Sequence, residues 1–147
     1  MNVQEINSRL ESLKEDSQPI FGKMTAQHMI EHLILTIKIS YGRIKIPHFE
    51  PSERQLKEKQ NLLYTVMEFP EGIKAPGLSD ELLPLRYANL NEAKKELIKS
   101  IEAFNELFTA NPDLIFIHPR LGLLNQTEWR TFHEKHLTHH FKQFGIK

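Results

Sequence analysis

The chain has 147 residues, 39% hydrophobic and 26% charged, which is the balance of a soluble globular protein. Nineteen basic and nineteen acidic residues cancel, which argues against a general nucleic-acid binder, because such proteins neutralise phosphates with an excess of Lys and Arg. No apolar run is long enough to span a membrane and no signal-peptide pattern follows Met1, so we expect a cytoplasmic protein that binds neither nucleic acid nor membranes.

Cysteine is absent from the sequence. This excludes disulfides, thiolate catalysis and zinc sites built on cysteine. Any metal site must therefore use imidazole, carboxylate, amide or water ligands, and histidine is the commonest of these in proteins.

The first half of the chain is predicted to form three helices. Residues 3–14 carry apolar side chains at helical spacing and predict a short amphipathic helix. A second, mostly apolar helix is predicted over 25–41, with Thr25 as its N-cap. Residues 43–55 contain two prolines and predict a loop, and 55–69 fit a third helix, although the LLYTVMEF stretch also fits a strand.

The second half is predicted to form two further helices. Residues 70–85 are rich in Pro and Gly and predict a long crossover loop. A capping box predicts a helix over 89–109, and 113–125 is predicted to be a loop. A second capping box begins the last helix, 125–144, and Gly145 is placed for a left-handed C-terminal cap.

These elements predict an all-α fold made of one domain, residues 1–147. Four principal helices, a short N-terminal helix and long crossover loops are typical of a four-helix bundle with crossovers. Metal and cofactor sites in such bundles are built from side chains that point inward from facing helices.

Two histidines on the last helix, His136 and His140, are spaced four residues apart within its apolar arc. Two imidazoles at this spacing can point at one shared atom, which is the helical geometry for two metal ligands. Four histidines in eight residues are equally compatible with a solvated, mildly basic C-terminus. A third ligand from elsewhere in the chain would favour the metal site.

That third ligand is predicted to be His32 on the second helix. It lies away from the narrow polar strip of this helix, so its imidazole must be hydrogen-bonded or bound to another group. His28 is one turn closer to the start of the helix and is compatible with solvent exposure. Glu31 precedes His32 but points elsewhere, and we do not assign it as a base.

Three stretches resemble the DinB-like superfamily of four-helix metalloproteins: GKMTAQHMIEHL, HPRLGLLNQTEW and KHLTHHFKQFG. More narrowly, the chain resembles a subgroup described only as a domain of unknown function. The similarity covers residues 21–146 and is more specific in the C-terminal part. It implies a divalent metal, most often zinc or nickel, bound by three histidines and water, and by motif position these ligands are His32, His136 and His140.

Two more residues are candidates for binding a cofactor or substrate. His118, within the HPRLG segment, is predicted either to line the pocket or to cap a loop carbonyl. Gln143 is predicted either to donate to a metal-bound water or to make a hydrogen bond at the helix end. Segments 70–85 and 118–122 are predicted to form the rim of the pocket over the metal.

Two functional interpretations follow. In the first, the protein is a metal-dependent transferase or hydrolase that acts on a small molecule, and the resemblance implies a low-molecular-weight thiol as cofactor. In the second, it is a non-catalytic helical module that binds a metal or small ligand as a homodimer. Three imidazoles leave an open coordination position, which is typical of catalytic sites.

Overall fold

A computed structural model of the chain describes residues 1–69 and 82–147. Within these residues the protein is mostly helical, with one small antiparallel sheet. In chain order the elements are α1 (Val3–Leu10), α2 (Ala26–Ser40), α3 (Glu53–Tyr64), α4 (Leu90–Ala110), β1 (Phe116–His118), β2 (Gly122–Leu124) and α5 (Gln126–Gln143). None of the helices in these two ranges has the length and apolar character needed to cross a membrane.

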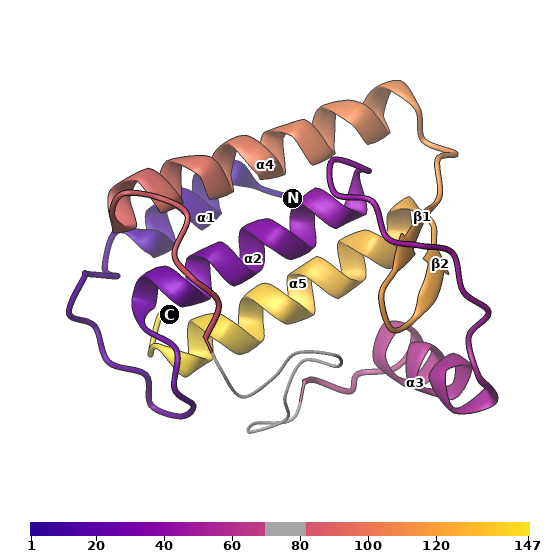
Figure 1. Cartoon of the computed structure of the whole chain (residues 1–147), viewed down its shortest axis with the longest axis horizontal. Helices are drawn as coiled ribbons and strands as arrows, with labels where there is room; N and C mark the ends of the chain where they lie inside the picture. The colour runs from indigo at the N-terminus through magenta and orange to yellow at the C-terminus, as the bar shows by residue number, and fades with distance from the viewer. Residues whose placement is uncertain (70–81) are drawn as a thin grey trace.

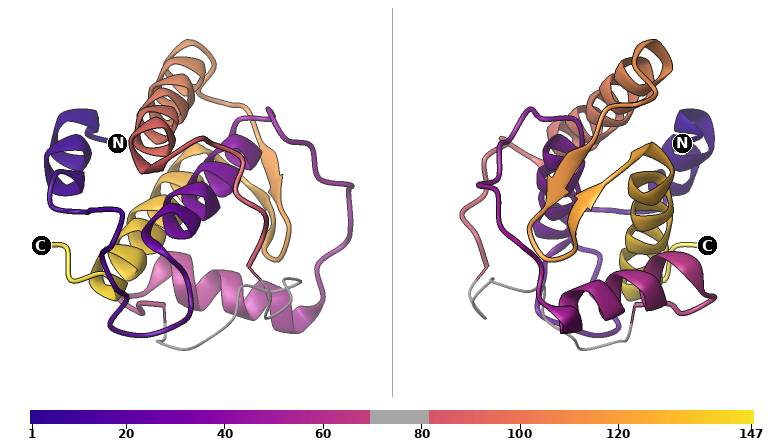
Figure 2. Two further views of the ribbon diagram at one scale, coloured as in Figure 1. Left: turned by 60° about the vertical axis from the view of Figure 1, so that its left-hand side comes forward. Right: turned by 90° about the vertical axis from the view of Figure 1, so that its right-hand side faces the viewer.

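Helices α2, α4 and α5 pack side by side along the long axis of the molecule, and α1 lies against α4 (Figure 1). Helix α2 runs antiparallel to α5, so the end of α2 lies beside the beginning of α5. Helix α3 lies outside this group and crosses beside α5, as Figure 2 shows. The buried apolar core joins residues of α1, α2, α4 and α5, with Trp129, Phe104, Phe108 and Phe141 as its largest members.

The predicted ends of the last helix are confirmed. Asn125 accepts a hydrogen bond from the Glu128 amide, and the Glu128 carboxylate accepts one from the Asn125 amide, which is a complete capping box. At the other end Gly145 has a φ of 66°, the left-handed conformation expected after the last turn. Helix α5 therefore ends where its sequence signals indicate.

Two helices of the first half differ from their predicted bounds. Helix α1 ends at Leu10 rather than Lys14. The carbonyl oxygens of Leu10 and Leu13, left without partners in the helix, accept hydrogen bonds from the Lys94 ammonium. Helix α3 begins at Glu53 within the predicted loop, where Ser52 opens a capping box. It ends at Tyr64, and the strand alternative for this stretch is not adopted.

The predicted loop 113–125 contains a hairpin, which corrects the purely helical expectation. Strands β1 and β2 pair in the register Phe116 with Leu124 and His118 with Gly122. The Trp129 indole donates a hydrogen bond of 3.0 Å to the Phe116 carbonyl and so ties the hairpin to the start of α5. Of the predicted crossover 70–85, residues 70–81 lie outside the described residues.

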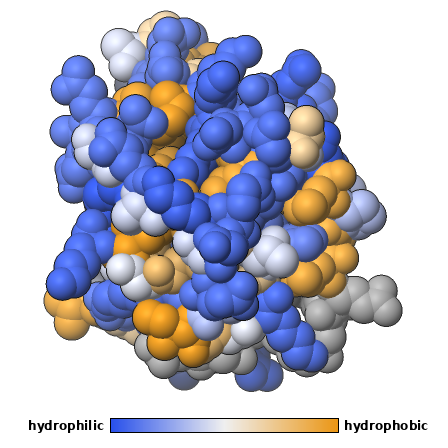
Figure 3. All heavy atoms as spheres, turned by 90° about the vertical axis from the view of Figure 1, so that its left-hand side faces the viewer, coloured by the Kyte–Doolittle hydropathy of each residue, from blue (hydrophilic) through white to orange (hydrophobic). Residues whose placement is uncertain are grey.

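The molecular surface at the start of α4 and the chain's C-terminus is mostly hydrophilic (Figure 3). Its apolar side chains are scattered among polar ones on the face shown, rather than gathered into one patch. This distribution is ordinary for a protein surface.

Candidate metal centre

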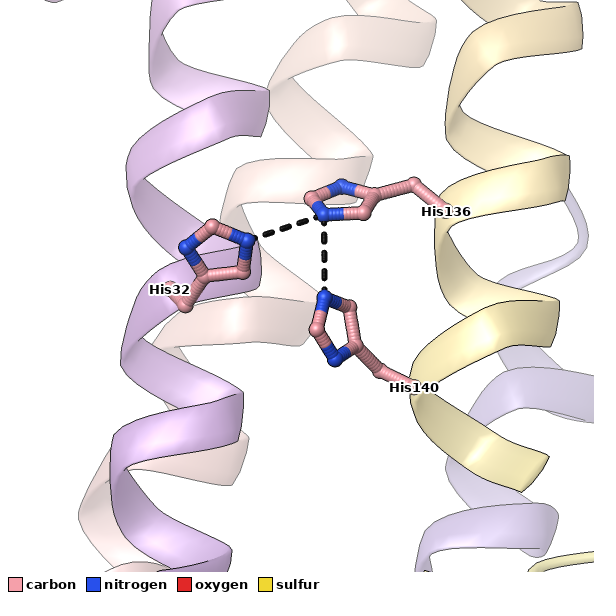
Figure 4. A group of neighbouring side chains, drawn as sticks. All are labelled: His32, His136 and His140. Carbon is pink, nitrogen blue, oxygen red and sulfur yellow. Dashed lines mark hydrogen bonds between the residues drawn. The ribbon is translucent and has the colours of Figure 1, made fainter. Parts of the chain in front are cut away.

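Three histidine side chains from two helices converge between α2 and α5 (Figure 4). The Nε2 atom of His136 lies 2.9 Å from that of His32 and 3.1 Å from that of His140. One nitrogen from each residue lies within 4.8 Å of the other two. The three residues predicted from helical phase therefore meet at one point in the fold.

Burial keeps these imidazoles neutral. His136 and His140 are buried, and His32 is partly buried. Burial, with the nearby charge of His139, lowers the pKa of His32 to about 4. Burial and the charge of His32 lower the pKa of His140 to about 3, and the same causes hold the pKa of His136 well below its usual value. At neutral pH all three rings are in the form that binds metals.

Gln143 sets the orientation of His140. Its side-chain amide donates to the Phe21 carbonyl at 3.0 Å, which directs its oxygen toward His140. The Nδ1 of His140 lies 2.7 Å from that oxygen and is therefore the protonated nitrogen. A neutral His140 with its proton on Nδ1 presents the Nε2 lone pair to the cluster. Gln143 thus acts on the ring of His140 from behind, as partners of metal-binding histidines commonly do.

Hydrogen bonds between neutral imidazoles cannot account for both of the close Nε2–Nε2 contacts of His136. A proton on His136 Nε2 can bond to the lone pair of His140, but then it leaves His136 no lone pair for His32. If His136 instead accepts a proton from His32, its lone pair faces the lone pair of His140. Neutral rings therefore satisfy one of the two close Nε2 contacts but not both.

These three imidazoles could hold a metal ion. Imidazole nitrogens bind zinc at about 2.0–2.1 Å, which places two of them about 2.9–3.4 Å apart for bond angles of about 90–110°. The observed separations of 2.9 and 3.1 Å from His136 agree with these values. Nitrogen ligands of this kind suit zinc, nickel and other first-row divalent ions.

Comparison with known protein families gives one finding. The family model described as Protein of unknown function (DUF1569) matches residues 70–147, slightly more than half of the chain. The chain belongs to the DUF1569 family. Neither curated proteins nor solved structures gave a match.

The DUF1569 match covers two of the three clustered histidines. It contains α4, the hairpin and α5, and hence His136 and His140. His32 on α2 lies before the matched range. The cluster is therefore assembled from the matched region and from a helix that precedes it, and the antiparallel packing of α2 on α5 brings the two together.

His118 does not join the three histidines of this DUF1569 protein. Its Nδ1 accepts hydrogen bonds from the amides of Arg120 and Leu121, which closes the turn of the hairpin. Its ring packs on Phe132, and Phe132 in turn packs on His136. Burial lowers the pKa of His118 to about 3. The contacts of His118 are those of a structural residue, although it binds amides rather than the predicted carbonyl.

His133 is a buried polar residue that sequence reasoning left unassigned. Its Nε2 lies 2.8 Å from the Ser40 hydroxyl, which donates to the Ile37 carbonyl and so accepts from the imidazole. Its ring stacks on Trp129 and contacts Phe104. His133 thus joins α5 to the end of α2. Its spacing of three residues from His136 on the same apolar arc was the available signal.

The Glu31 carboxylate makes its hydrogen bonds outside the cluster, in agreement with the sequence analysis. Its carboxylate accepts hydrogen bonds from the Arg86 amide at 2.7 Å and from the Gln27 side chain at 2.8 Å. Gln27 also donates to the Tyr87 carbonyl at 2.8 Å. These two side chains fasten the chain that enters α4 to the helix that carries His32.

Proposed function

We propose that this protein binds one divalent metal ion through the Nε2 atoms of His32, His136 and His140. The observation that carries the proposal is the convergence of three neutral imidazoles whose two close contacts cannot both be satisfied by protons. A cation at their meeting point accepts all three lone pairs at once.

We propose zinc or nickel as the bound ion, since neutral imidazole ligands suit both. A divalent ion held by three protein ligands retains an open position and supplies Lewis-acid chemistry there. The chain's own contribution is to keep the three rings neutral, to fix the tautomer of His140 through Gln143, and to surround His136 with the rings of Phe132 and Phe69.

We further propose that the fold is a DinB-like four-helix bundle, and that the protein is a metal-dependent transferase or hydrolase acting on a small molecule. The resemblance of the three sequence stretches and the open three-histidine site support this. Because the chain has no cysteine, a thiol taking part in the reaction would be a separate small molecule. A screen for thiol-dependent conjugation by the metal-loaded protein tests the activity, and no turnover there favours the non-catalytic metal-binding module.

Metal titration of the metal-free protein tests the binding site directly. We expect one zinc or nickel ion per chain, and we expect His140→Ala to lose most of the affinity while keeping its helical circular dichroism. The apolar core joins four helices and does not depend on the imidazole. His28→Ala is the matched control, because His28 lies one turn before His32 on the same helix and contacts Thr25 instead.

Two outcomes would contradict the proposal. Binding of less than one ion per chain by the wild-type protein is the first. The second is equal affinity in wild type, His140→Ala and His28→Ala, which would place the metal elsewhere. Loss of fold together with metal in His140→Ala would show that the ion has a structural rather than a functional role.

A further inference from the structure

Phe69 lies between the histidine cluster and an outer pocket. Its ring centroid is 5.5 Å from that of His136 and 5.4 Å from that of Phe132. Phe69 also lines a surface pocket of about 260 Å³, together with His139 and Lys142. The same aromatic ring therefore contacts one of the three converging histidines and forms part of the wall of a pocket large enough for a small molecule.

Lys135 holds the chain that carries Phe69. Its ammonium donates to the carbonyl oxygens of Leu62, Thr65 (2.8 Å) and Met67 (2.6 Å). Three carbonyls use all three hydrogens of an ammonium group. Leu62 belongs to the last turn of α3, where the helix dipole also favours a cation. One side chain of α5 thus fastens the end of α3 and the residues that follow it.

The position of Lys135 couples this anchor to the cluster. It directly precedes His136, and neighbouring helical residues point about 100° apart around the axis. The turn of α5 that presents the His136 imidazole to α2 therefore presents the Lys135 ammonium to α3. The Lys142–Glu68 ion pair, 2.9 Å long, is a second link to the same segment. Both of its side chains are more than half exposed, so it contributes little.

We infer that Phe69, positioned by Lys135, is the wall between the outer pocket and His136, and that it limits the access of small molecules to the cluster. The inference builds on the proposed function, because access matters only at a site that binds a ligand. The expected structural effect requires no bound metal: releasing Lys135 or deleting the Phe69 ring opens His136 to the pocket.

Chemical modification of the metal-free protein tests this inference. Diethylpyrocarbonate reacts with accessible neutral imidazoles, and fragmentation of the peptides in the mass spectrometer gives the rate at each histidine. Lys135→Met keeps the aliphatic stem but removes the ammonium, and Phe69→Ala removes the ring. We expect each to raise the rate at His136 at least about tenfold. Tenfold corresponds to about 1.4 kcal/mol.

The controls lie in the same helix. His133 is buried against Trp129 and Phe104, so its rate should stay at the wild-type value in both variants. Lys142→Met removes the exposed ion pair and should leave the His136 rate within about twofold of wild type. Cleavage after Glu134 places His133 and His136 on different peptides in every variant.

The two substitutions should also be non-additive. Once the ring is gone, its anchor has nothing to position, so the double variant should match Phe69→Ala at His136. An unchanged His136 rate in Phe69→Ala overturns the inference, and this holds even where Lys135→Met does not fold. An equal rise at His133 also overturns it, because that would show general loosening of α5.

Metal release separates this inference from the proposed function. With zinc or cobalt bound, transfer to a chelator should be faster in Phe69→Ala and Lys135→Met than in wild type and Lys142→Met. Absence of metal binding in wild type overturns the proposed function and leaves the modification rates as the test of the wall. Normal binding with unchanged modification and release rates overturns the wall alone.

Discussion

Acid should destabilise the metal-free protein well above the pH at which carboxylates titrate. Five histidines that are buried or partly buried have lowered pKa values: His32 at about 4, His118, His133 and His140 at about 3, and His136 well below its usual range. Burial is the largest cause in each case. In the unfolded chain the same groups titrate near 6.5. Above about pH 6.5 these groups are neutral in both states and cost no stability. As the pH falls below about 6.5 the unfolded chain binds protons that the folded protein does not, so the folded state loses stability.

The size of the effect follows from proton linkage. Each histidine that is neutral in the folded state and free to protonate in the unfolded state costs about 0.8 kcal/mol at pH 6.0 and about 1.4 kcal/mol at pH 5.5. Five such groups lower the free energy of unfolding by about 4 kcal/mol between pH 7.5 and 6.0, and by about 7 kcal/mol by pH 5.5. This is a large share of a typical domain stability of about 5–15 kcal/mol.

Urea denaturation followed by circular dichroism, with a chelator present throughout, measures this loss. His133→Gln removes one titrating group without touching the cluster, and its pH dependence should be smaller than that of wild type by about a fifth. His48→Gln is the control, since His48 is exposed and pairs with Glu50. A fall of less than about 1 kcal/mol between pH 7.5 and 6.0 in wild type would refute the claim that burial keeps these rings neutral.

Three further predictions concern single side chains. Gln143→Leu removes the acceptor of the His140 Nδ1 proton and should lower metal affinity about 10–100-fold, measured by competition with a chelator. Glu58→Gln breaks the two-point ion pair with Arg120, at 2.5 and 2.6 Å, which ties the hairpin to α3; we expect a loss of about 1 kcal/mol in urea denaturation and unchanged metal affinity. Phe104→Ala empties a fully buried core position and should cost about 3–5 kcal/mol, measured in the same way.

Much of the helical core could be read from the sequence because its signals are local. Capping residues and Gly145 act on the backbone within a few positions, so they marked both ends of α5. The hairpin was missed because its strands have three residues each, too few for an alternating pattern to stand out. Its stability comes from distant partners, such as Trp129 and the ion pair to Glu58.

Helical periodicity was enough to bring His32, His136 and His140 to the inner faces of two helices, because side-chain direction on a helix is set by position alone. The tautomer of His140 depends on the contacts of Gln143 with His140 and with Phe21 across the fold. The pairing of α2 with α5 depends on the packing of the shared core. These were decided by the tertiary structure.

The roles of Lys135 and Phe69 were likewise outside the reach of the sequence. A lysine beside a histidine looks like ordinary solvated surface, and its three carbonyl partners lie about seventy positions earlier in the chain. Local sequence determined which helices form and which faces they bury, since propensity, capping and periodicity act over a few residues. Only the packed structure decided which helix meets which and what encloses the cluster, because those contacts join residues that no local pattern relates.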